Sequence, residues 1–407
     1  GRTKRRYNED SRMKRHVCRY WRKPTQSVVS FGNIPLVNYF PGQGEAAEVK
    51  RYPLVLYYCP SCKLGQTGVT VPPEDIFPLY HYVTGSSLPL VTHLTKLAAM
   101  VEKNKYLQKN ASVLDIGCND GSLLSVFAKK GYRVLGVDPA KNIATLAKSR
   151  GIPVITDFFG ENLAKKIRET HGQFQIIIIT HTLANIPDLR DFLRGVVLLL
   201  TPGGTLIIEV ASWEDMVDRG QIDAVYHEHY YYFSESSLVR ILNQSGLVVT
   251  HMIRNPAQGG STQVIATPGN IQKRIPLRQV SAQKLATLAK RSSAYRVKLR
   301  GLIRKYRNKT VIGFGAPAKA VTLLNWAGIT AKDITFVVDS TPVKQGRVLP
   351  GVNIPIYPEE YVKGKHIDAV VLLAWNYRDE ILKKIFKLIG RSTSVITPFP
   401  RLKVVEL

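Results

Sequence analysis

The stretch VLDIGCNDGSLL, from Val113 to Leu124, decides the fold class of this chain. Its apolar first half leads into a loop that contains Gly117 and Gly121, and a helical pattern begins after the loop. Glycines let the backbone turn tightly and let a ligand approach it, while the first turn of a helix attracts negative charge. A strand, a glycine loop and a helix in this order predict one unit of a parallel sheet covered by helices.

Similar units continue along the chain. The apolar runs RVLGVD, FQIIIIT and TLIIEV alternate with helical patterns, so residues 91–265 predict a doubly wound α/β domain. The runs TVIGFG, ITFVVD, AVVLLAW and TSVITP predict a second, smaller α/β domain over residues 310–407. Residues 1–24 form a basic arm, residues 25–90 a small domain with a pair of Cys, and residues 271–309 basic linker helices.

Length and composition indicate a globular protein with more than one domain. The chain has 407 residues, of which 44% are hydrophobic and 21% charged. No apolar run approaches the ~20 residues that cross a bilayer, so we expect no membrane span. Four Cys are too few for a disulfide framework, which favours a reducing compartment. The chain begins with Gly, and we expect a processed end that is compatible with the mitochondrial matrix.

The net charge of +27 is concentrated in two segments. Residues 1–24 contain ten Lys and Arg and two acidic residues, and residues 271–310 contain thirteen Lys and Arg and no acidic residue. Lys and Arg gathered in this way usually meet phosphate, so both segments predict RNA or another polyanion as a partner. A solvated helix face is the alternative, although like charges at helical spacing repel.

Acidic residues near the ends of the predicted strands indicate a nucleoside ligand. Asp115 can face a cationic amine, and Asp138, at the tip of the second strand, can accept both hydroxyls of a ribose. Asp157 and Phe158 follow the third strand and could bind and stack an adenine. These groups together predict S-adenosylmethionine, with an empty crevice as the alternative. The predicted cofactor site comprises Asp115, Gly117, Gly121, Asp138, Asp157 and Phe158.

The segment YHEHYYYFS, from Tyr226 to Ser234, allows two interpretations. It could be a buried aromatic strand whose polar groups are satisfied, or it could supply the base and hydrogen-bond donors of an active site. A carbon beside a ketone becomes a nucleophile only after it loses a proton, and a neutral His is suited to removing that proton. Tyr or amide donors can then stabilise the enolate oxygen.

These motifs, in this order, resemble the three-domain S-adenosylmethionine-dependent C-methyltransferases that act on nucleotide-linked keto-sugars. The similarity runs from about Cys18 to the C terminus and rests on FGNIPLVNYF, CPSC, YHYVTGSS, VLDIGCNDGSLL, YHEHYYYFS, GFGAPAKAVTLLN, VVDSTPVKQGRVLPG and LAWN. It implies an N-terminal zinc-binding domain, a class I (Rossmann-like) methyltransferase domain, and a C-terminal Rossmann-like domain that closes over the nucleotide-sugar. It also implies that His229 acts as the base, supported by Glu228 and Tyr226.

The implied zinc site departs from the family pattern. The family uses two C-x-x-C pairs, of which Cys59 and Cys62 form one. The other pair retains Cys18 but has Trp21 at the expected fourth ligand. Three thiolates alone make an incomplete tetrahedral site, so His16 would have to substitute or the metal would be lost.

Two further positions differ from the family. His181 and Asn185 stand in exchanged positions after the fourth strand, from which they could still meet a substrate. An expected His-Gly-Gly turn reads Gln258-Gly259-Gly260, and Gln cannot act as a base. We predict His181 as a catalytic residue and Asn185, Gln258 and Gly259 as substrate contacts.

The last domain contains a second candidate ligand loop. Gly315 and Lys319 could hold a diphosphate at a helix N-terminus, and Asp339 could bind a ribose or sugar hydroxyl. A structural strand-to-helix turn with a surface Lys is the alternative. The sequence thus leaves two functions open. One is a nucleotide-sugar C-methyltransferase, and the other is a repurposed methyltransferase fold bound to RNA in a ribonucleoprotein such as an organellar ribosome.

Overall fold

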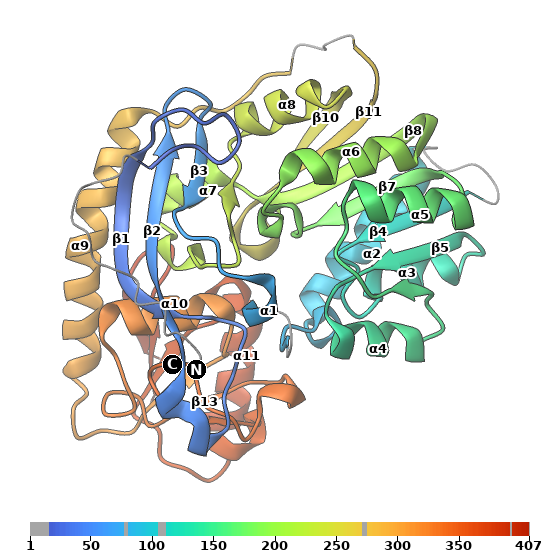
Figure 1. The fold of residues 1–407 in the computed structure, drawn as a ribbon. Helices are drawn as coiled ribbons and strands as arrows, with labels where there is room; N and C mark the ends of the chain where they lie inside the picture. The colour runs from blue at the N-terminus through green and yellow to red at the C-terminus, as the bar shows by residue number, and fades with distance from the viewer. Residues whose placement is uncertain (1–15, 77–79, 105–110, 271–274, 391–392, 407) are drawn as a thin grey trace, which may run out of the picture.

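The computed structural model describes residues 16–76, 80–104, 111–270, 275–390 and 393–406 (Figure 1). Most of the predicted basic arm and residues 271–274 of the predicted linker lie outside these ranges. The described chain forms three sheets. Among the described helices, none is long and apolar enough to cross a membrane.

The first sheet is antiparallel and recruits a strand from a distant part of the chain. Its spatial order is β1 (Gln26–Pro35), β2 (Arg51–Cys59), β3 (Leu64–Thr67) and β9 (Tyr231–Tyr232). The last of these belongs to YHEHYYYFS and pairs Tyr232 with Gly65. The N-terminal sheet therefore fixes the segment in which we predict the catalytic residues.

The second sheet has seven strands and a reversal of strand order at its centre. β4 pairs in parallel with β5 on one side and with β7 on the other, which confirms the doubly wound prediction. The last two strands, β11 and β10, are antiparallel. The spatial order is β10 (Leu247–Asn255), β11 (Ser261–Pro268), β8 (Leu200–Ala211), β7 (Phe174–Thr180), β4 (Ser112–Ile116), β5 (Arg133–Val137) and β6 (Val154–Ile155).

Helices cover both faces of this sheet, which explains the unbroken apolar run in β7. Ile176 and Ile178 pack with α2, α3 and α4, whereas Ile177 and Ile179 pack with α5, α6 and α8. Successive side chains of a strand point to opposite faces, so both faces must be apolar. These helices are α2 (Leu88–Lys103), α3 (Ser122–Ala128), α4 (Lys141–Ser149), α5 (Glu161–His171), α6 (Leu189–Leu199) and α8 (Glu235–Gln244). In contrast, α7 (Trp213–Arg219) belongs to the core that contains β1 and β2.

The third sheet forms the C-terminal unit, with α10 (Ala318–Ala327) and α11 (Arg378–Ile389). Five of its strands are parallel and β17 is antiparallel. The order is β14 (Ile356–Tyr357), β13 (Phe336–Val338), β12 (Val311–Phe314), β15 (Ala369–Leu372), β16 (Ser394–Thr397) and β17 (Lys403–Glu406). The remaining helical turns are η1 (Gln43–Glu48), α1 (Pro73–Ile76), η2 (Thr84–Ser86), η3 (Leu183–Asn185), η4 (Ile222–Ala224), η5 (Ala257–Gly259), η6 (Pro342–Lys344), η7 (Glu359–Val362) and η8 (Trp375–Tyr377).

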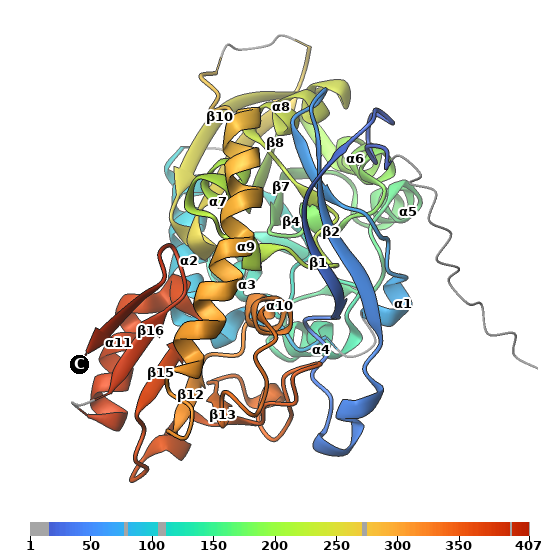
Figure 2. The same cartoon turned by 90° about the vertical axis from the view of Figure 1, so that its left-hand side faces the viewer.

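A single long helix, α9 (Ala282–Arg304), connects the second and third sheets and lies along β1 (Figure 2). The side chain of Ser281 accepts a hydrogen bond from the Lys284 amide and caps its N-terminus. Leu285, Leu288, Leu299 and Ile303 on its buried face share one core with β1, β2 and the C-terminal unit. The packing of α9 therefore ties the first and third sheets together.

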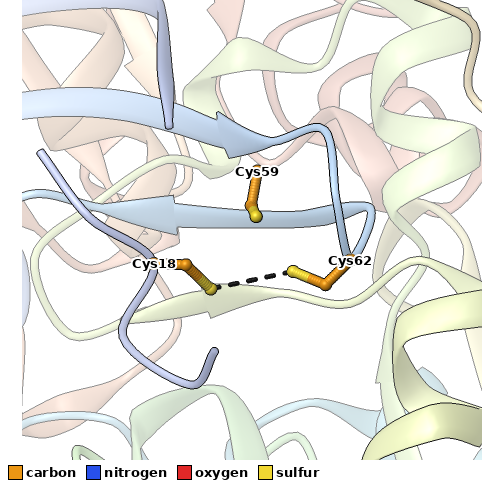
Figure 3. Close-up of side chains that lie close together, drawn as sticks. All are labelled: Cys18, Cys59 and Cys62. Carbon is orange, nitrogen blue, oxygen red and sulfur yellow. Dashed lines mark hydrogen bonds between the residues drawn. The ribbon is translucent and has the colours of Figure 1, made fainter. Parts of the chain in front are cut away.

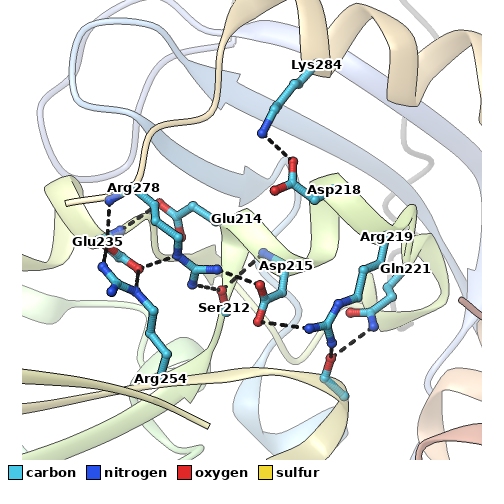
Figure 4. A network of polar contacts seen from close by, with 11 residues as sticks. Ser212, Glu214, Asp215, Asp218, Arg219, Gln221, Glu235, Arg254, Arg278 and Lys284 are labelled. Atoms are coloured by element: carbon cyan, nitrogen blue, oxygen red, sulfur yellow. Dashed lines mark hydrogen bonds and ion pairs between the residues drawn. The ribbon is translucent and has the colours of Figure 1, made fainter. Parts of the chain in front are cut away.

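Acidic partners for the basic linker come from other parts of the chain. Arg278 pairs with Asp215 at 2.6 Å and with Glu235 at 2.7 Å, and Lys284 pairs with Asp218 at 2.7 Å (Figure 4). The linker sequence contains no acidic residue and therefore suggested more unpaired charge than the structure has. Acidic residues from other parts of the chain pair with the linker in the folded protein. The exposed cations of the linker without an acidic salt-bridge partner among the described residues are Lys290, Arg291, Arg296, Lys298, Lys305, Arg307 and Lys309.

Candidate active site

A cavity of about 340 Å³ lies where β4, β5 and β7 end, at the reversal of strand order. Five of the six predicted cofactor residues line it, namely Asp115, Gly117, Asp138, Asp157 and Phe158. Gly121 is outside the lining. It caps α3 with φ of 73°, and a Cβ there would lie 3.0 Å from the Cβ of Ala147, so it serves the turn and its packing.

Asp115 offers the cavity an unpaired carboxylate oxygen. The residue is 2% exposed, and its Oδ1 has no hydrogen-bond partner among the described residues. Burial, followed by the charge of Asp138, raises the pKa of Asp115 to about 8. Buried polar atoms are rarely left unpaired, so this oxygen fits a cationic ligand group.

Asp138 is held rigidly at the tip of β5. Its Oδ2 accepts a hydrogen bond from the Asn119 amide and its Oδ1 from the Ala140 amide, both at 2.9 Å. Each carboxylate oxygen can accept a further hydrogen bond, as a ribose hydroxyl would require. Phe158 is 52% exposed and leaves ring surface for stacking. Together with Asp115, these residues fit S-adenosylmethionine.

Gly117 makes room for the chain itself as well as for a ligand. Its φ is 81°, and a Cβ at this position would lie 2.1 Å from Oγ1 of Thr182. The glycine therefore lets the loop after β7 approach the loop after β4. The approach brings His181 and Asn185 to the cavity, which both residues line.

The segment YHYVTGSS closes another side of the cavity. Its Thr84 amide donates to Asn119 Oδ1 at 2.8 Å, which fastens it to the glycine loop. Tyr80 and Tyr82 line the cavity and were not assigned to the site from the sequence. The sequence did contain a signal for these two tyrosines, because they belong to YHYVTGSS, one of the motifs on which the family resemblance rests.

YHEHYYYFS combines both interpretations given above. Tyr230, Tyr231, Tyr232 and Phe233 are at most 3% exposed, and the three hydroxyls each bond to a backbone group. His227 bonds through Nε2 to the backbone of β2, and burial lowers its pKa to about 4. The aromatic half of the segment is therefore mainly structural, and Tyr230 also lines the cavity.

The polar half forms two pairs, of which the pair at Glu228 is buried and the pair of Tyr226 and His229 is half-buried. The hydroxyl of Tyr226 lies 2.8 Å from Nε2 of His229. Burial, followed by the nearby ring of His181, lowers the pKa of His229 to about 3, so this imidazole is a weak base at neutral pH. Glu228 accepts a hydrogen bond from the side chain of Asn38. Burial raises the pKa of Glu228 to about 7.

A third polar group centres on Glu209, which the sequence did not indicate. Its fully buried carboxylate lies 2.8 Å from His93 Nε2 and 3.1 Å from His181 Nε2. Asn255 donates to the same carboxylate at 3.1 Å. An acidic residue within an apolar strand gives little sequence signal, because its partners come from α2, the loop after β7, and β10.

The predicted substrate residues lie in different places. Asn185 lines the cavity, and its Oδ1 has no partner among the described residues. Gln258 lies 3.4 Å from the hydroxyl of Tyr82 and 3.5 Å from the side chain of Asn376. A Cβ on Gly259 would lie 2.8 Å from the Trp375 ring. The last two residues therefore mark the contact between the methyltransferase domain and the C-terminal unit.

In the second glycine loop, groups of the protein itself take up much of the space and hydrogen bonding predicted for a ligand. Asp339 accepts the amides of Ala316 at 2.6 Å and Thr341 at 2.8 Å. A Cβ on Gly315 would lie 2.5 Å from the Cβ of Ala374. Lys319 does not face this loop's acid. Its Nζ lies 4.3 Å from the centre of the Trp375 ring, and its pKa falls to about 8 because of burial, despite the charge of Asp223.

Three cysteine sulfurs converge in the N-terminal domain (Figure 3). Those of Cys18, Cys59 and Cys62 lie within 4.8 Å of one another, as a thiolate metal site requires. His16 is engaged elsewhere, with Nδ1 3.0 Å from the hydroxyl of Thr25. The described residues thus supply three ligands and no fourth His, Cys, Asp or Glu.

Three known protein families match consecutive parts of the chain. The family described as "Putative zinc binding domain" matches residues 18–77, "Methyltransferase domain" matches residues 91–252, and "C-methyltransferase C-terminal domain" matches residues 256–400. The curated C-methyltransferase NovU from Streptomyces niveus is 32% identical over 396 residues, which cover 93% of this chain and 94% of NovU.

More distant similarities cover less than half of the chain. The mitochondrial ubiquinone biosynthesis O-methyltransferase of Homo sapiens is 27% identical over 165 residues, which cover 36% of this chain and 45% of that protein. The solved magnesium protoporphyrin IX methyltransferase from Synechocystis PCC 6803 with bound SAM is 17% identical. Its alignment covers 43% of this chain and 78% of that one, with a TM-score of 0.32, which is too low to support an inference.

Proposed function

Because this chain belongs to the C-methyltransferase family, we propose that it methylates a carbon beside a ketone in a nucleotide-linked sugar. The methyl donor is S-adenosylmethionine, which supplies an electrophilic methyl group when bound. One observation carries the proposal for the substrate carbon. The unpaired oxygen of Asp115 and the imidazole of His181 belong to one cavity, so a donor site and a candidate base are adjacent.

Residues next to the wall of this cavity can perform the proton chemistry of such a reaction. Tyr226 and Glu228 are outside the lining, but burial, followed by the charges of Glu228 and Tyr226, raises the pKa of Tyr80, which lines the cavity, so both groups lie near its wall. A base has to take the proton from carbon, and hydrogen-bond donors have to hold the enolate oxygen that results. Tyr226 presents a phenolic hydroxyl, and its half-buried partner His229 fixes the position of that hydroxyl. Glu228, with a pKa near 7, can share a proton with the substrate at neutral pH. We assign Tyr226 and Glu228 to the sugar oxygens.

The nucleotide belongs between the methyltransferase domain and the C-terminal unit. Lys319 is the cation that we assign to the nucleotide, and it lies beside Asp223 and Trp375. The Trp375 indole donates to Asp223 at 2.7 Å, which orders both groups. A diphosphate would compete with Asp223 for Lys319. Gly315 and Asp339 would contribute through the loop that follows β12.

Isotopic transfer tests the proposed function directly. The full chain is incubated with S-[methyl-¹³C]adenosylmethionine and a panel of thymidine- and uridine-diphosphate 4-keto-6-deoxyhexoses. We expect a product whose ¹³C methyl group is bonded to carbon in the NMR spectrum. His251→Asn, on the exposed surface of β10, should be fully active and serves as the matched control. A methyl group on oxygen, or no product from any member of the panel, would contradict the proposal.

A role in RNA binding is the second candidate, and it rests on charge alone. The similar proteins named above do not support it, and Arg278 and Lys284 are already paired with acids. The surface that remains is the exposed side of α9, with Lys290, Arg291 and Lys298. Reversing these three charges should abolish salt-dependent binding of a 20-mer RNA in a titration from low to physiological salt. Unchanged binding would remove this candidate.

A further inference from the structure

A short segment between the buried residues His81 and Leu90 forms part of the wall of the methyl-donor cavity without being buried itself. None of residues 82–89 is buried. Tyr82 and Thr84 line the cavity from this segment, which we call the strap. Segments with little buried surface open at a low cost in free energy, while their buried neighbours stay in place. The strap is therefore a part of the wall that can move.

Hydrogen bonds hold the strap against the glycine loop. The Thr84 amide donates to Asn119 Oδ1 at 2.8 Å, and the Gly85 amide donates to Asp120 Oδ2 at 2.9 Å. In return, Asn119 Nδ2 donates to the Tyr82 carbonyl at 3.1 Å. Because water can replace each of these bonds when the strap lifts, the closed position is favourable and reversible.

Asn119 connects the strap to the carboxylate that we predict to bind the ribose. Its side chain holds the strap, while its own amide donates to Asp138 Oδ2 at 2.9 Å. The φ of Asn119 is 50°, which is uncommon for a residue other than glycine. Strained residues of this kind persist where their surroundings enforce them, and they gather at functional sites. The strap thus closes the side of the cavity next to Asp138.

The cavity is covered at one end and open to the surface at the other. Asp115 and Asp138 are 2% and 7% exposed, whereas Phe158 is 52% exposed. A donor whose adenine stacks on Phe158 has its base near the surface. Its ribose and amino acid then lie deeper, beneath the strap.

The C-terminal unit contacts the strap from outside. The Thr341 hydroxyl donates to Oγ of Ser86 at 3.4 Å, across 255 residues of the chain. Thr341 is buried and is itself fixed, because its amide donates to Asp339 Oδ1 at 2.8 Å. The same C-terminal loop that we assign to the nucleotide therefore meets the strap over the donor cavity.

We propose that the strap is a gate over the methyl-donor cavity, closed by its bonds to Asn119 and Asp120 and held by Thr341 of the C-terminal unit. The strap has to separate from the glycine loop before S-adenosylmethionine can enter or S-adenosylhomocysteine can leave. Loops that close over a ligand commonly set the rate of its release. The gate concerns exchange of the donor and its product, so it does not depend on which acceptor is methylated.

A reversible crosslink tests the gate in the full chain. In the double variant Ser86→Cys, Thr341→Cys, two sulfurs replace oxygens that lie 3.4 Å apart. Oxidised glutathione accepts the two electrons and two protons that are released when the disulfide forms. The reduced protein is loaded with tritiated S-adenosylhomocysteine, oxidised, and mixed with excess unlabelled compound. Release should be at least about tenfold slower from the oxidised than from the reduced protein.

The same protein in its two redox states is the matched comparison. The wild-type chain, whose four cysteines are buried, is taken through the same oxidation and should release the ligand at an unchanged rate. Equal release rates from the crosslinked and the reduced double variant would overturn the gate. A double variant that forms no disulfide in the mass spectrum would overturn the hold by the C-terminal unit.

Loosening the strap should have the opposite effect. A Cβ on Gly85 would overlap Oδ2 of Asp120, the atom that accepts the Gly85 amide, so Gly85→Ala should displace the strap. Gly44→Ala is the control, because Gly44 is exposed and no described atom lies within 4 Å of the position of its Cβ. We expect both entry and release of S-adenosylhomocysteine to be at least about fivefold faster in Gly85→Ala.

The two directions of exchange separate a gate from a damaged site. Faster release combined with slower entry in Gly85→Ala would mean that the binding site itself is impaired, and would overturn the gate. Rates equal to those of Gly44→Ala would do the same. A wild-type chain that methylates no member of the sugar panel refutes the proposed function and leaves the gate in place, because the gate is measured without turnover.

Discussion

The side-chain amide of Asn38 donates a hydrogen bond to the buried carboxylate of Glu228, 190 residues away in the chain. The carbonyl of the same Asn38 lies 3.2 Å from Nδ1 of His81. Three motifs that are far apart in sequence, FGNIPLVNYF, YHYVTGSS and YHEHYYYFS, thus meet at one residue. The N-terminal domain thereby supplies part of the site that the central domain was predicted to contain.

Removing this hydrogen bond should destabilise the protein in a pH-dependent way. Asn38→Leu deprives ionised Glu228 of its donor, which costs about 1–3 kcal/mol for a buried group. The pKa of Glu228 in the folded state is about 7, and the loss of Asn38 raises it further. The penalty should therefore be small at pH 5.5, where Glu228 is protonated, and should grow as the pH rises through 7.

Urea unfolding at pH 5.5 and pH 8 measures this effect. Asn33→Leu, at an exposed position of β1, is the matched control and should cost the same at both pH values. An equal loss of stability for Asn38→Leu at both pH values would show that Glu228 is not the group affected.

The fold could be predicted where a pattern of apolar residues marks the strands and helices. The isoleucines of β7 form an unbroken apolar run because two layers of helices cover them, and this pattern is visible in the sequence. β9 could not be predicted, since only two residues of YHEHYYYFS pair and their partner strand is some 160 residues earlier. The charge of the linker was misjudged for the same reason, because Glu235 and Asp215 reach Arg278 from outside the segment.

Binding of the methyl donor should release a proton at neutral pH. The folded-state pKa of Asp115 is about 8, so most of this carboxyl is protonated at pH 7. A cationic ligand favours the ionised form, and its affinity should rise with pH up to about 8. Calorimetry in two buffers that differ in ionisation enthalpy counts the protons released. Asp115→Asn should bind at least about tenfold more weakly and release none.

Asp157→Asn is the matched control for the proton release. Asp157 lines the same cavity, but the carboxyl whose pKa is raised by burial and by the charge of Asp138 is that of Asp115. Its substitution should alter affinity without changing the number of protons released. Equal heats in both buffers for the wild-type protein would contradict a role for Asp115 in binding the amine.

Site residues that belong to a sequence motif could be predicted. Site residues whose partners come from distant parts of the chain could not. Asp115 lies near the end of β4 and Asp138 directly follows β5, and both line the cavity. Glu209 reads as one polar residue in the apolar strand TLIIEV, and only the packing of α2 and the loop after β7 gives it partners. Gly117 was recognised, but its contact with Thr182 depends on how two loops meet.

The close approach of Thr182 to Gly117 should make Gly117 more sensitive to substitution than other glycines in the left-handed region. Gly131 has φ of 83°, and no described atom lies within 4 Å of the position of its Cβ. Gly131→Ala should therefore cost only the conformational term of about 1–2 kcal/mol. Gly117→Ala adds a clash with Thr182, worth about 1–3 kcal/mol more.

A double variant distinguishes the clash from the strain. Thr182→Gly removes the side chain that the new Cβ would meet, so it should recover the extra loss in Gly117→Ala but not the conformational term. Free energies of unfolding in urea provide the comparison. Equal losses for Gly117→Ala and Gly131→Ala would show that the two loops separate without cost.

The three-cysteine cluster predicts a metal site that can be completed by one substitution. Zinc strongly prefers four ligands in structural sites, and Trp21 stands where the family has the fourth thiolate. The Trp21 amide lies 3.5 Å from the Cys18 sulfur, so this position is next to the cluster. Trp21→Cys should slow the loss of zinc to a chelator by at least about tenfold relative to wild type.

Metal content by mass spectrometry of the intact protein, before and after chelation, provides the measurement. Cys62→Ser should lower the zinc content, because two thiolates remain, whereas Cys118→Ser should not, since Cys118 is not part of the cluster. Zinc retained equally by Cys62→Ser and the wild type would mean that the metal binds elsewhere. If the wild-type chain contains no zinc and the Trp21→Cys chain binds it, then Trp21 prevents metal binding, and the three cysteines of the wild type are buried free thiols.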